Sequence, residues 1–237
     1  MKKKRILGVI PAKGGSTRLP RKNILPLGGK PMLQWAVESA RQSGLIDRLI
    51  VSTEDAEVAD VAKKLGVDVP FIRPQKLAKD PAGVVQVTLH AIEMLREQGD
   101  EYDEVIILLP TSPFRSAQDI TDAYRLFQEK HAEFLMSVSE FSHTPYAAMT
   151  LENDILAPVF PELIGRKSQE MPPAYRPNGA LHILNIKAFE REKSYFAQPL
   201  VGYVMPLERS VDIDTKLDLI MAEAMLALAN AEAAHEE

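Results

Sequence analysis

Hydrophobic and polar positions along the chain follow two alternating patterns. Short apolar runs such as Arg5–Ile10, Arg48–Ser52 and Glu104–Leu109 have the length and composition of strands buried on both faces. Between them lie amphipathic segments whose apolar residues recur every three or four positions, which is the helical period. This alternation predicts βαβ units, and therefore an α/β fold with a mostly parallel sheet and flanking helices.

The same patterns set the remaining predicted elements. Helices are expected over Pro31–Ser43, Glu54–Leu65, Val84–Gln98, Ala117–His131 and Thr215–Ala234. Further strands are expected over Val67–Ile72, Glu133–Val138, Ala180–Leu184 and Leu200–Met205.

The alternation stops between residues 140 and 178. This stretch holds six of the 17 prolines and no clear amphipathic helix, so we expect a small β arm or a lid that leaves the sheet. A lone arm could not easily bury its apolar side chains against its own sheet. The sequence therefore predicts one α/β domain, formed by residues 1–139 and 179–237, and a protruding arm formed by residues 140–178.

Composition excludes several classes of function. The 28 basic and 33 acidic residues give a net charge of −5, which argues against a dedicated nucleic-acid binder. The chain has no cysteine, which excludes disulfides, thiolate nucleophiles and cysteine-ligated metals. The first apolar run is too short for a secretory signal, and no run approaches the ~18 residues of a membrane span. We expect a cytoplasmic protein that does not bind membranes.

Glycines and cations are concentrated just after the first predicted strand, in Pro11–Asn23. Ligands of open α/β sheets bind at that edge, and Gly14 and Gly15 would allow the backbone to approach a ligand closely. Four cations lie within ten residues: Lys13, Arg18, Arg21 and Lys22. This chemistry suits a polyphosphate, although the spacing is neither that of a P-loop nor that of a dinucleotide-binding loop. The alternative is a glycine turn with solvated charges.

Two aspartates near the end of the chain form the second candidate cluster. Asp212 and Asp214 flank Ile213, and in an extended segment residues two apart point to the same side. Both carboxylates could therefore bind one Mg²⁺, a metal that commonly bridges carboxylates and substrate phosphates. The alternative is that Asp214 caps the final helix and Asp212 is merely solvated.

Six segments, in order along residues 5–220, resemble motifs of one family. Residues 11–23, PAKGGSTRLPRKN, resemble the opening signature of the acylneuraminate cytidylyltransferases, also called CMP-sialic acid synthetases. The other five are VSTED at 51–55, FIRP with LAKD at 71–80, LPTSPFR at 109–115, YRPNGA at 175–180 and SVDIDT at 210–215. The resemblance implies a nucleotide-binding α/β domain and a homodimer whose arm (140–178) completes the sugar pocket. It also implies a divalent metal, usually magnesium.

The resemblance also implies roles for individual residues. Lys22, Asp212 and Asp214 would be catalytic, with both aspartates as metal ligands and Asp214 as the first choice for the proton acceptor. Nucleotide binding would fall to Ala12, Lys13, Gly14, Gly15, Ser16, Arg18, Lys22, Asn23 and Arg73. Sugar binding would fall to Arg115, Arg166, Arg176 and Asn178. For Arg115, a surface ion pair is an equal alternative.

The chain departs from the family pattern at Thr17, Val84, Leu109 and Ser168, so the sugar is not fixed by the motifs. The resemblance implies an enzyme that transfers CMP from CTP to an acidic nine-carbon (nonulosonic) sugar and releases pyrophosphate. One alternative is a cytidylyltransferase for the eight-carbon acid KDO, whose loop shares Ser-Thr-Arg-Leu-Pro. The other is a catalytically silent protein that binds nucleotide sugars.

Overall fold

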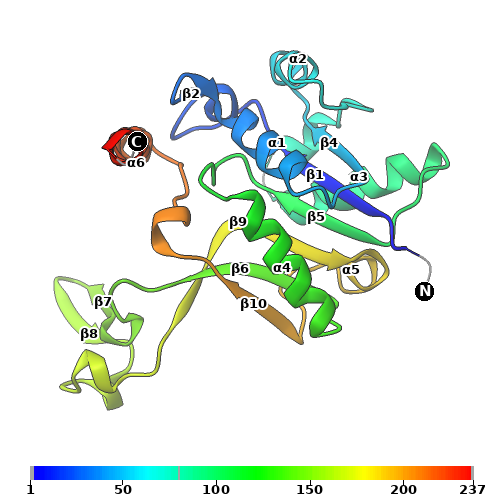
Figure 1. The fold of residues 1–237 in the computed structure, drawn as a ribbon. Helices are drawn as coiled ribbons and strands as arrows, with labels where there is room; N and C mark the ends of the chain where they lie inside the picture. The colour runs from blue at the N-terminus through cyan, green and yellow to red at the C-terminus, as the bar shows by residue number, and fades with distance from the viewer. Residues whose placement is uncertain (1–2, 80, 236–237) are drawn as a thin grey trace.

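A six-stranded sheet with helices on both faces forms the body of the protein (Figure 1). The computed structural model describes residues 3–79 and 81–235. The strands are β1 (Ile6–Pro11), β2 (Pro26–Leu27), β3 (Lys30–Pro31), β4 (Arg48–Ser52), β5 (Glu104–Leu108), β6 (Phe134–Glu140), β7 (Met149–Glu152), β8 (Ile155–Pro158), β9 (Tyr175–Asn185) and β10 (Leu200–Val204). The helices are α1 (Met32–Gln42), α2 (Ala56–Lys64), α3 (Val84–Glu97), α4 (Ala117–Glu129), α5 (Ile186–Glu192) and α6 (Lys216–His235).

The sheet is mostly parallel, as the alternation predicted. Its strand order is β10-β6-β9-β5-β1-β4, and only β9 runs antiparallel to its neighbours. Apolar residues of α1, α2 and α4 pack against one face, and those of α3 and α5 pack against the other. All five residues of β5 are buried, which explains why this strand has no polar face in the sequence.

Three predicted elements differ from the structure. The strand expected over Ala180–Leu184 begins five residues earlier, because β9 runs from Tyr175 to Asn185. The strand expected over Val67–Ile72 is wrong: the segment makes only isolated bridges to Ile50 and Thr53. Pro70 interrupts it and has no N–H to donate to a ladder. The helix expected from Glu54 begins at Ala56, because the Asp55 side chain caps it by accepting a hydrogen bond from the backbone N–H of Val58 at 3.0 Å.

Short elements escaped prediction. Helix α5 has only seven residues, which is too short to show a helical period, and Asn185 caps its amino end. The β2–β3 hairpin turns through Gly28 and Gly29, both with positive φ, in the manner of the two-residue turns that glycine favours.

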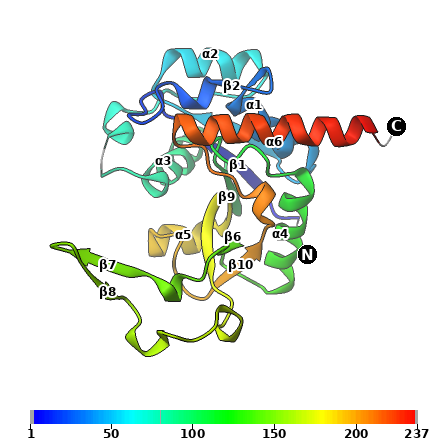
Figure 2. The ribbon, with the colours of Figure 1, turned by 90° about the vertical axis from the view of Figure 1, so that its left-hand side faces the viewer.

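The expected β arm is present as a hairpin of β7 and β8 that projects away from the sheet (Figures 1 and 2). Because β6 extends to Glu140 and β9 begins at Tyr175, the irregular part of the arm is slightly shorter than expected. The hairpin exposes large apolar side chains, with Leu151 66% and Ile155 71% exposed. Helix α6 crosses the same side of the molecule and also exposes apolar residues, among them Leu217 and Leu228 (Figure 2).

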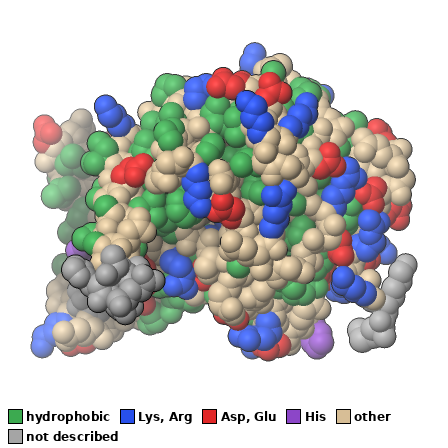
Figure 3. All heavy atoms as spheres, turned by 45° about the horizontal axis from the view of Figure 1, so that its top comes forward, with side chains coloured by type: hydrophobic (Ala, Val, Ile, Leu, Met, Phe, Trp, Pro, Cys, Tyr) green, Lys and Arg blue, Asp and Glu red, His purple; other side chains and the backbone are tan. Residues whose placement is uncertain are grey.

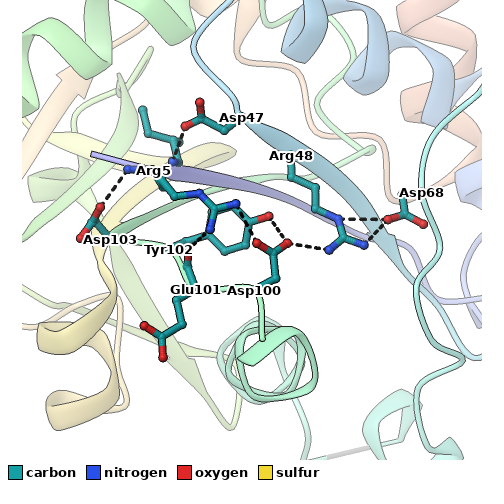
Figure 4. Close-up of polar contacts among 9 residues, drawn as sticks. Arg5, Asp47, Arg48, Asp68, Asp100, Glu101, Tyr102 and Asp103 are labelled. Atoms are coloured by element: carbon teal, nitrogen blue, oxygen red, sulfur yellow. Dashed lines mark hydrogen bonds and ion pairs between the residues drawn. The ribbon is translucent and has the colours of Figure 1, made fainter. Parts of the chain in front are cut away.

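A network of hydrogen bonds and ion pairs lies at the amino ends of the strands (Figure 4). Asp100 accepts hydrogen bonds from Arg5, Arg48 and the Tyr102 hydroxyl. Arg48 also pairs with Asp68, and Arg5 lies over the Tyr102 ring. This network lies at the end of β1 and β5 opposite to the ligand edge, so it stabilises the fold without approaching the predicted site.

Figure 3 shows Lys and Arg side chains interspersed with Asp and Glu side chains, with groups of hydrophobic side chains between them. Within the part of the chain that the structure describes, no helix is long and apolar enough to cross a membrane.

Candidate active site

A pocket of about 180 Å³ opens at the carboxyl ends of β1 and β5. Pro11 ends β1, and Leu109, Pro110 and Thr111 follow β5, so the pocket lies where open α/β sheets bind ligands. The rest of its lining comes from the segment Pro11–Asn23, called the glycine loop below, and from the segment that leads into α3. Four of the predicted nucleotide-binding residues line it: Lys13, Lys22, Asn23 and Arg73.

The loop between β1 and α1 is held in shape from within. The Asn23 amide is buried and donates to the Lys13 carbonyl at 2.8 Å, which links the start of the loop to its end. Arg21 takes a left-handed conformation, with φ of 60°, just before the 3-10 turn Lys22–Ile24. These contacts turn Lys22 toward the pocket, and its side chain is only 13% exposed.

Gly14 and Gly15 have different surroundings. A Cβ at Gly14 would overlap the Asp55 carboxylate, whereas a Cβ at Gly15 would meet nothing within 4 Å. The Gly14 N–H donates to Glu54 at 2.8 Å, so in this structure it serves the protein rather than a ligand. Glycine is therefore required at position 14 for close packing, and Gly15 remains free to approach a phosphate.

Of the other predicted loop residues, Ala12 is fully buried and its N–H extends the β1–β4 ladder. Ser16 is partly exposed and Arg18 is exposed, beside the pocket rather than in its lining.

Asp214 lies between two cations of the loop. Its carboxylate accepts from Lys22 Nζ at 2.5 Å and pairs with Arg18. Partial burial disfavours the charge of Asp214, but the contacts with Lys22 and Arg18 outweigh it and lower the pKa of the carboxyl below its usual value. In this arrangement Asp214 is a weak proton acceptor, which differs from the role expected for it.

Asp212 lies next to this cluster at the solvent edge. The backbone N–H of Ile213 donates to the Thr111 carbonyl at 2.8 Å, which fixes the segment against the pocket lining. Desolvation by the surrounding protein raises the pKa of the Asp212 carboxyl, and the nearby negative charge of Asp214 raises it further. The two aspartates are close enough for their charges to interact.

The alternative role for Asp214 as a helix cap is not realised. Thr215 Oγ1 accepts from the N–H of Asp218, and the Asp218 carboxylate accepts from the N–H groups of Asp214 and Thr215. The start of α6 is thus satisfied by a Thr215–Asp218 capping pair, which leaves the Asp214 carboxylate for other contacts.

These residues fit a Mg²⁺ ion in part. They supply two carboxylates, the oxygen ligands that Mg²⁺ prefers, and magnesium usually completes its shell with water and substrate phosphates. In residues 3–79 and 81–235, no group of three or more His, Asp or Glu side chains forms a ready-made metal site. A metal here would need oxygens from the substrate.

Two of the predicted sugar-binding residues are turned into the protein instead. The Arg115 side chain, 2% exposed, donates to the backbone carbonyls of Leu109 and Ala180. Burial lowers its pKa to about 10. Asn178 is buried as well, and its amide joins Ser137, Ala180 and Ser210. The expected direct contact of these two side chains with a sugar is therefore not available here.

Arg115 and Asn178 instead hold segments next to the site in place through these buried hydrogen bonds. The contact of Asn178 Nδ2 with Ser210 Oγ, at 2.9 Å, ties β9 to the segment that carries Asp212. Arg176 on β9 and Arg166 in the arm are exposed, away from the pocket lining. The structure therefore does not bring the four sugar-side candidates together in one chain.

Six apolar or small residues of the pocket lining were not among the predicted site residues, although the family motif at 71–80 and the departure at Val84 fall in this segment. They are Leu77, Ala78, Ala82, Gly83, Val84 and Val87. Gly83 is the N-cap of α3, so the amino end of a 14-residue helix points at the pocket. The available signal was a predicted helix starting at Val84 directly after a glycine, in a segment already linked to Arg73.

Comparisons with known proteins identify the family of this chain. The family model described as Cytidylyltransferase matches residues 7–154. The pseudaminic acid cytidylyltransferase of Campylobacter jejuni is 35% identical over 220 residues, which cover 92% of this chain and 95% of that protein. The CMP-N,N'-diacetyllegionaminic acid synthase of Legionella pneumophila is 32% identical over 228 residues, 94% of this chain and 97% of its own length.

A solved structure has the same fold. It is a CMP:2-keto-3-deoxy-manno-octonic acid synthetase complexed with CTP, with a TM-score of 0.71 over 95% of this chain and 99% of that one. At 17% identity, this likeness concerns the fold alone.

Proposed function

The chain belongs to the cytidylyltransferase family, and on that premise we propose that it couples a nonulosonic acid to CMP, using CTP and releasing pyrophosphate. The anomeric hydroxyl of the sugar attacks the α-phosphate and gives its proton to a carboxylate or to water, a P–O bond forms to the sugar, and the bond to pyrophosphate breaks. The relatives named for pseudaminic and legionaminic acids support this class of acceptor. The observation that carries the proposal is the position of Lys22 in a pocket at the carboxyl end of β1, where it forms an ion pair with Asp214.

The pocket suits a nucleoside triphosphate. Lys13 and Lys22 lie on one wall, and Arg73 lies in the lining toward α3. A cation held rigidly beside the α-phosphate stabilises the charge that develops on the transferring and leaving groups. Lys22 is suited to this role because its side chain is largely buried and its position is fixed by the loop.

Asp212 and Asp214 would hold the magnesium ion that this reaction class needs. When bound, such an ion screens phosphate charge and helps pyrophosphate leave. Asp214 already neutralises Lys22 and Arg18 in the structure. Binding of CTP would let these cations exchange the carboxylate for phosphate oxygens, which frees Asp214 for the metal.

The acceptor side would be completed by a second copy of the chain. The arm exposes Leu151 and Ile155 to solvent, and burial of such side chains in a dimer is favourable. The exposed Arg166 on the same arm would then serve the partner's site, where a cation can pair with the sugar carboxylate. Since CTP is a cytoplasmic nucleotide, we expect the reaction to take place in the cytoplasm.

The test is pyrophosphate release from CTP with a panel of acidic sugars. The panel contains pseudaminic, legionaminic and N-acetylneuraminic acids and KDO, with and without Mg²⁺. Release that requires one of the nine-carbon acids supports the proposal. Release with KDO alone would favour the eight-carbon alternative. Binding of CTP without release for any sugar would favour a silent binder, and would contradict the assignment of Lys22, Asp212 and Asp214 as catalytic.

A further inference from the structure

Two adjacent acids after β4 hold both ends of the glycine loop. They are Glu54 and Asp55, in the Val51–Asp55 segment, to which the sequence comparison assigned no role. Glu54 contacts the start of the loop at Gly14, and Asp55 contacts its end at Arg21. The two ends of the phosphate-binding segment are therefore fixed to one short piece of chain.

Glu54 also binds Arg73, a residue of the pocket lining. Its Oε2 accepts from Nε and Nη2 of Arg73 at 2.9 and 2.6 Å, while its Oε1 accepts from the Gly14 N–H at 2.8 Å. The side chains of Glu54 and Arg73 are 5% and 2% exposed. The backbone N–H of Arg73 donates to the Thr53 carbonyl at 2.9 Å, which places the two residues side by side.

Asp55 has a more local task. It caps α2 through Val58 and accepts from Arg21 Nη1 at 2.7 Å. Its carboxylate fills the space that a side chain at position 14 would need. The hydrogen bond from Arg21 is the main cause of the low pKa of this carboxyl, so Asp55 stays charged at neutral pH.

The burial of the Glu54–Arg73 pair makes its two partners depend on each other. If Glu54 loses its charge, the Arg73 guanidinium remains buried without a counterion, next to a neutral side chain and the Ser52 carbonyl at 3.3 Å. A buried cation without its counterion is strongly unfavourable, so Arg73 must move toward solvent. That movement takes it out of the pocket lining.

We propose that Glu54 is a positioning residue for CTP, which sets the geometry of the phosphate loop through Gly14 and the position of Arg73 in the pocket lining. The proposal rests on the proposed function in that CTP is the ligand. Glu54 lies below the pocket lining rather than in it, so it acts through these two partners and does not touch the nucleotide. The proposal predicts that loss of Glu54 weakens the binding of CTP and leaves the KM for the sugar nearly unchanged.

The experiment compares Glu54→Gln with wild type by calorimetric titration of CTP in Mg²⁺ and by steady-state kinetics. The substituted amide keeps an acceptor for the Gly14 N–H but cannot neutralise Arg73. We expect CTP affinity to fall about 10- to 100-fold, the range for loss of a charged buried hydrogen bond. The KM for the sugar should change less than about twofold. Glu133→Gln is the matched control, because Glu133 forms an exposed ion pair with Arg191 far from the pocket.

A second pair of variants tests the route through Arg73. The double variant Glu54→Gln/Arg73→Met removes both buried charges, so it should fold even if Glu54→Gln does not. We expect it to bind CTP as weakly as Arg73→Met and no more weakly. CTP affinity of Glu54→Gln within twofold of wild type would overturn the proposal, as would a double variant several-fold weaker than Arg73→Met.

The titration also separates this inference from the proposed function. Wild type that binds CTP but releases no pyrophosphate with any sugar contradicts the catalytic assignment and leaves the test of Glu54 intact. Wild type that turns over normally while Glu54→Gln is unimpaired contradicts the inference alone.

Discussion

The ammonium of Lys22 lies 2.5 Å from the carboxylate of Asp214, although 192 positions separate the two residues in the sequence. This contact joins the glycine loop after β1 to the segment before α6. Asp214 balances the charge of Lys22. Partial burial disfavours the charge of Asp214, but the contacts with Lys22 and Arg18 outweigh it and lower the pKa of the carboxyl. The pair is the centre of the candidate site.

Substitution of Lys22 tests its role in charge stabilisation. Lys22→Ala should lower kcat and kcat/KM together by about 10²-fold, as expected when an electrostatic contact made in the transition state is lost. Steady-state kinetics with varied CTP measure both parameters. Lys130→Ala, at the exposed end of α4, is the control. A change confined to KM for CTP would show that Lys22 only contributes uniform binding.

Substitution of Asp214 tests its assignment as a metal ligand. Asp214→Asn keeps the size of the side chain but removes the charge that would hold Mg²⁺, so turnover should fall about 10²-fold or more. The loss should be greatest at limiting magnesium, as a titration of rate against Mg²⁺ would reveal. Activity close to wild type at limiting magnesium would refute this assignment.

The two glycines of the loop should respond differently to alanine. Gly14→Ala forces a Cβ into the Asp55 carboxylate and should destabilise the fold by about 1–3 kcal/mol, the usual range for overpacking. Gly15→Ala meets nothing within 4 Å and should leave stability unchanged. Urea unfolding of the two variants provides the comparison. Equal stabilities would show that the Asp55 carboxylate is not fixed against position 14.

The stability contributed by Asp100 should depend on pH. The hydrogen bond from Tyr102, followed by those from Arg48 and Arg5, lowers its pKa from 3.8 to about 2. A carboxyl with a depressed folded-state pKa stabilises the protein above its unfolded pKa, and this contribution disappears as pH falls toward the folded value. With allowance for solvent screening, Asp100→Asn should therefore cost about 1–2 kcal/mol near neutral pH and much less near pH 2.

Urea unfolding of Asp100→Asn and wild type between pH 7 and pH 2 measures that difference. Asp60→Asn, an exposed substitution on α2, provides the reference for a lost surface charge. A stability difference that stays constant over the whole range would exclude the proposed linkage.

Mixed dimers test whether the arm of one chain serves the site of another. Arg166→Ala and Asp214→Asn chains should each be nearly inactive alone. If sites form across the interface, a mixture should regain activity, because one site of each heterodimer then has both residues intact. Mass in solution establishes the dimer. Heterodimers that form without any recovery of activity would rule out a shared site, even if the protein is dimeric.

Much of the fold was predictable because it is encoded locally. The strands β1, β4 and β5 were predicted within one or two residues from uninterrupted apolar runs, and α1, α3 and α4 from helical periodicity. The strand expected over Val67–Ile72 failed because an apolar run does not reveal that Pro70 interrupts pairing. Helix α5 escaped because seven residues are too few to show a period.

The candidate site was predictable only in part. Lys13, Lys22, Asn23 and Arg73 line the pocket as the motifs implied. The first three lie in the loop that begins at the end of β1, where open α/β sheets bind ligands. Arg115 and Asn178 lie in motifs just as clear, yet both are buried and bind backbone or neighbouring side chains. A motif locates a residue along the chain but does not show which way its side chain turns.

The sequence by itself determined most of the order of the longer strands and helices, the place of the glycine loop at a strand end, and the family. Tertiary structure alone decided that Glu54 lies between Gly14 and Arg73, and that Asp214 faces Lys22. The reason is physical. Periodicity records whether a residue is buried, and burial is largely a local property of its element. The partner of a buried charge is chosen among many acids and bases of equal chemistry, and that choice is made only when distant parts of the chain close around it.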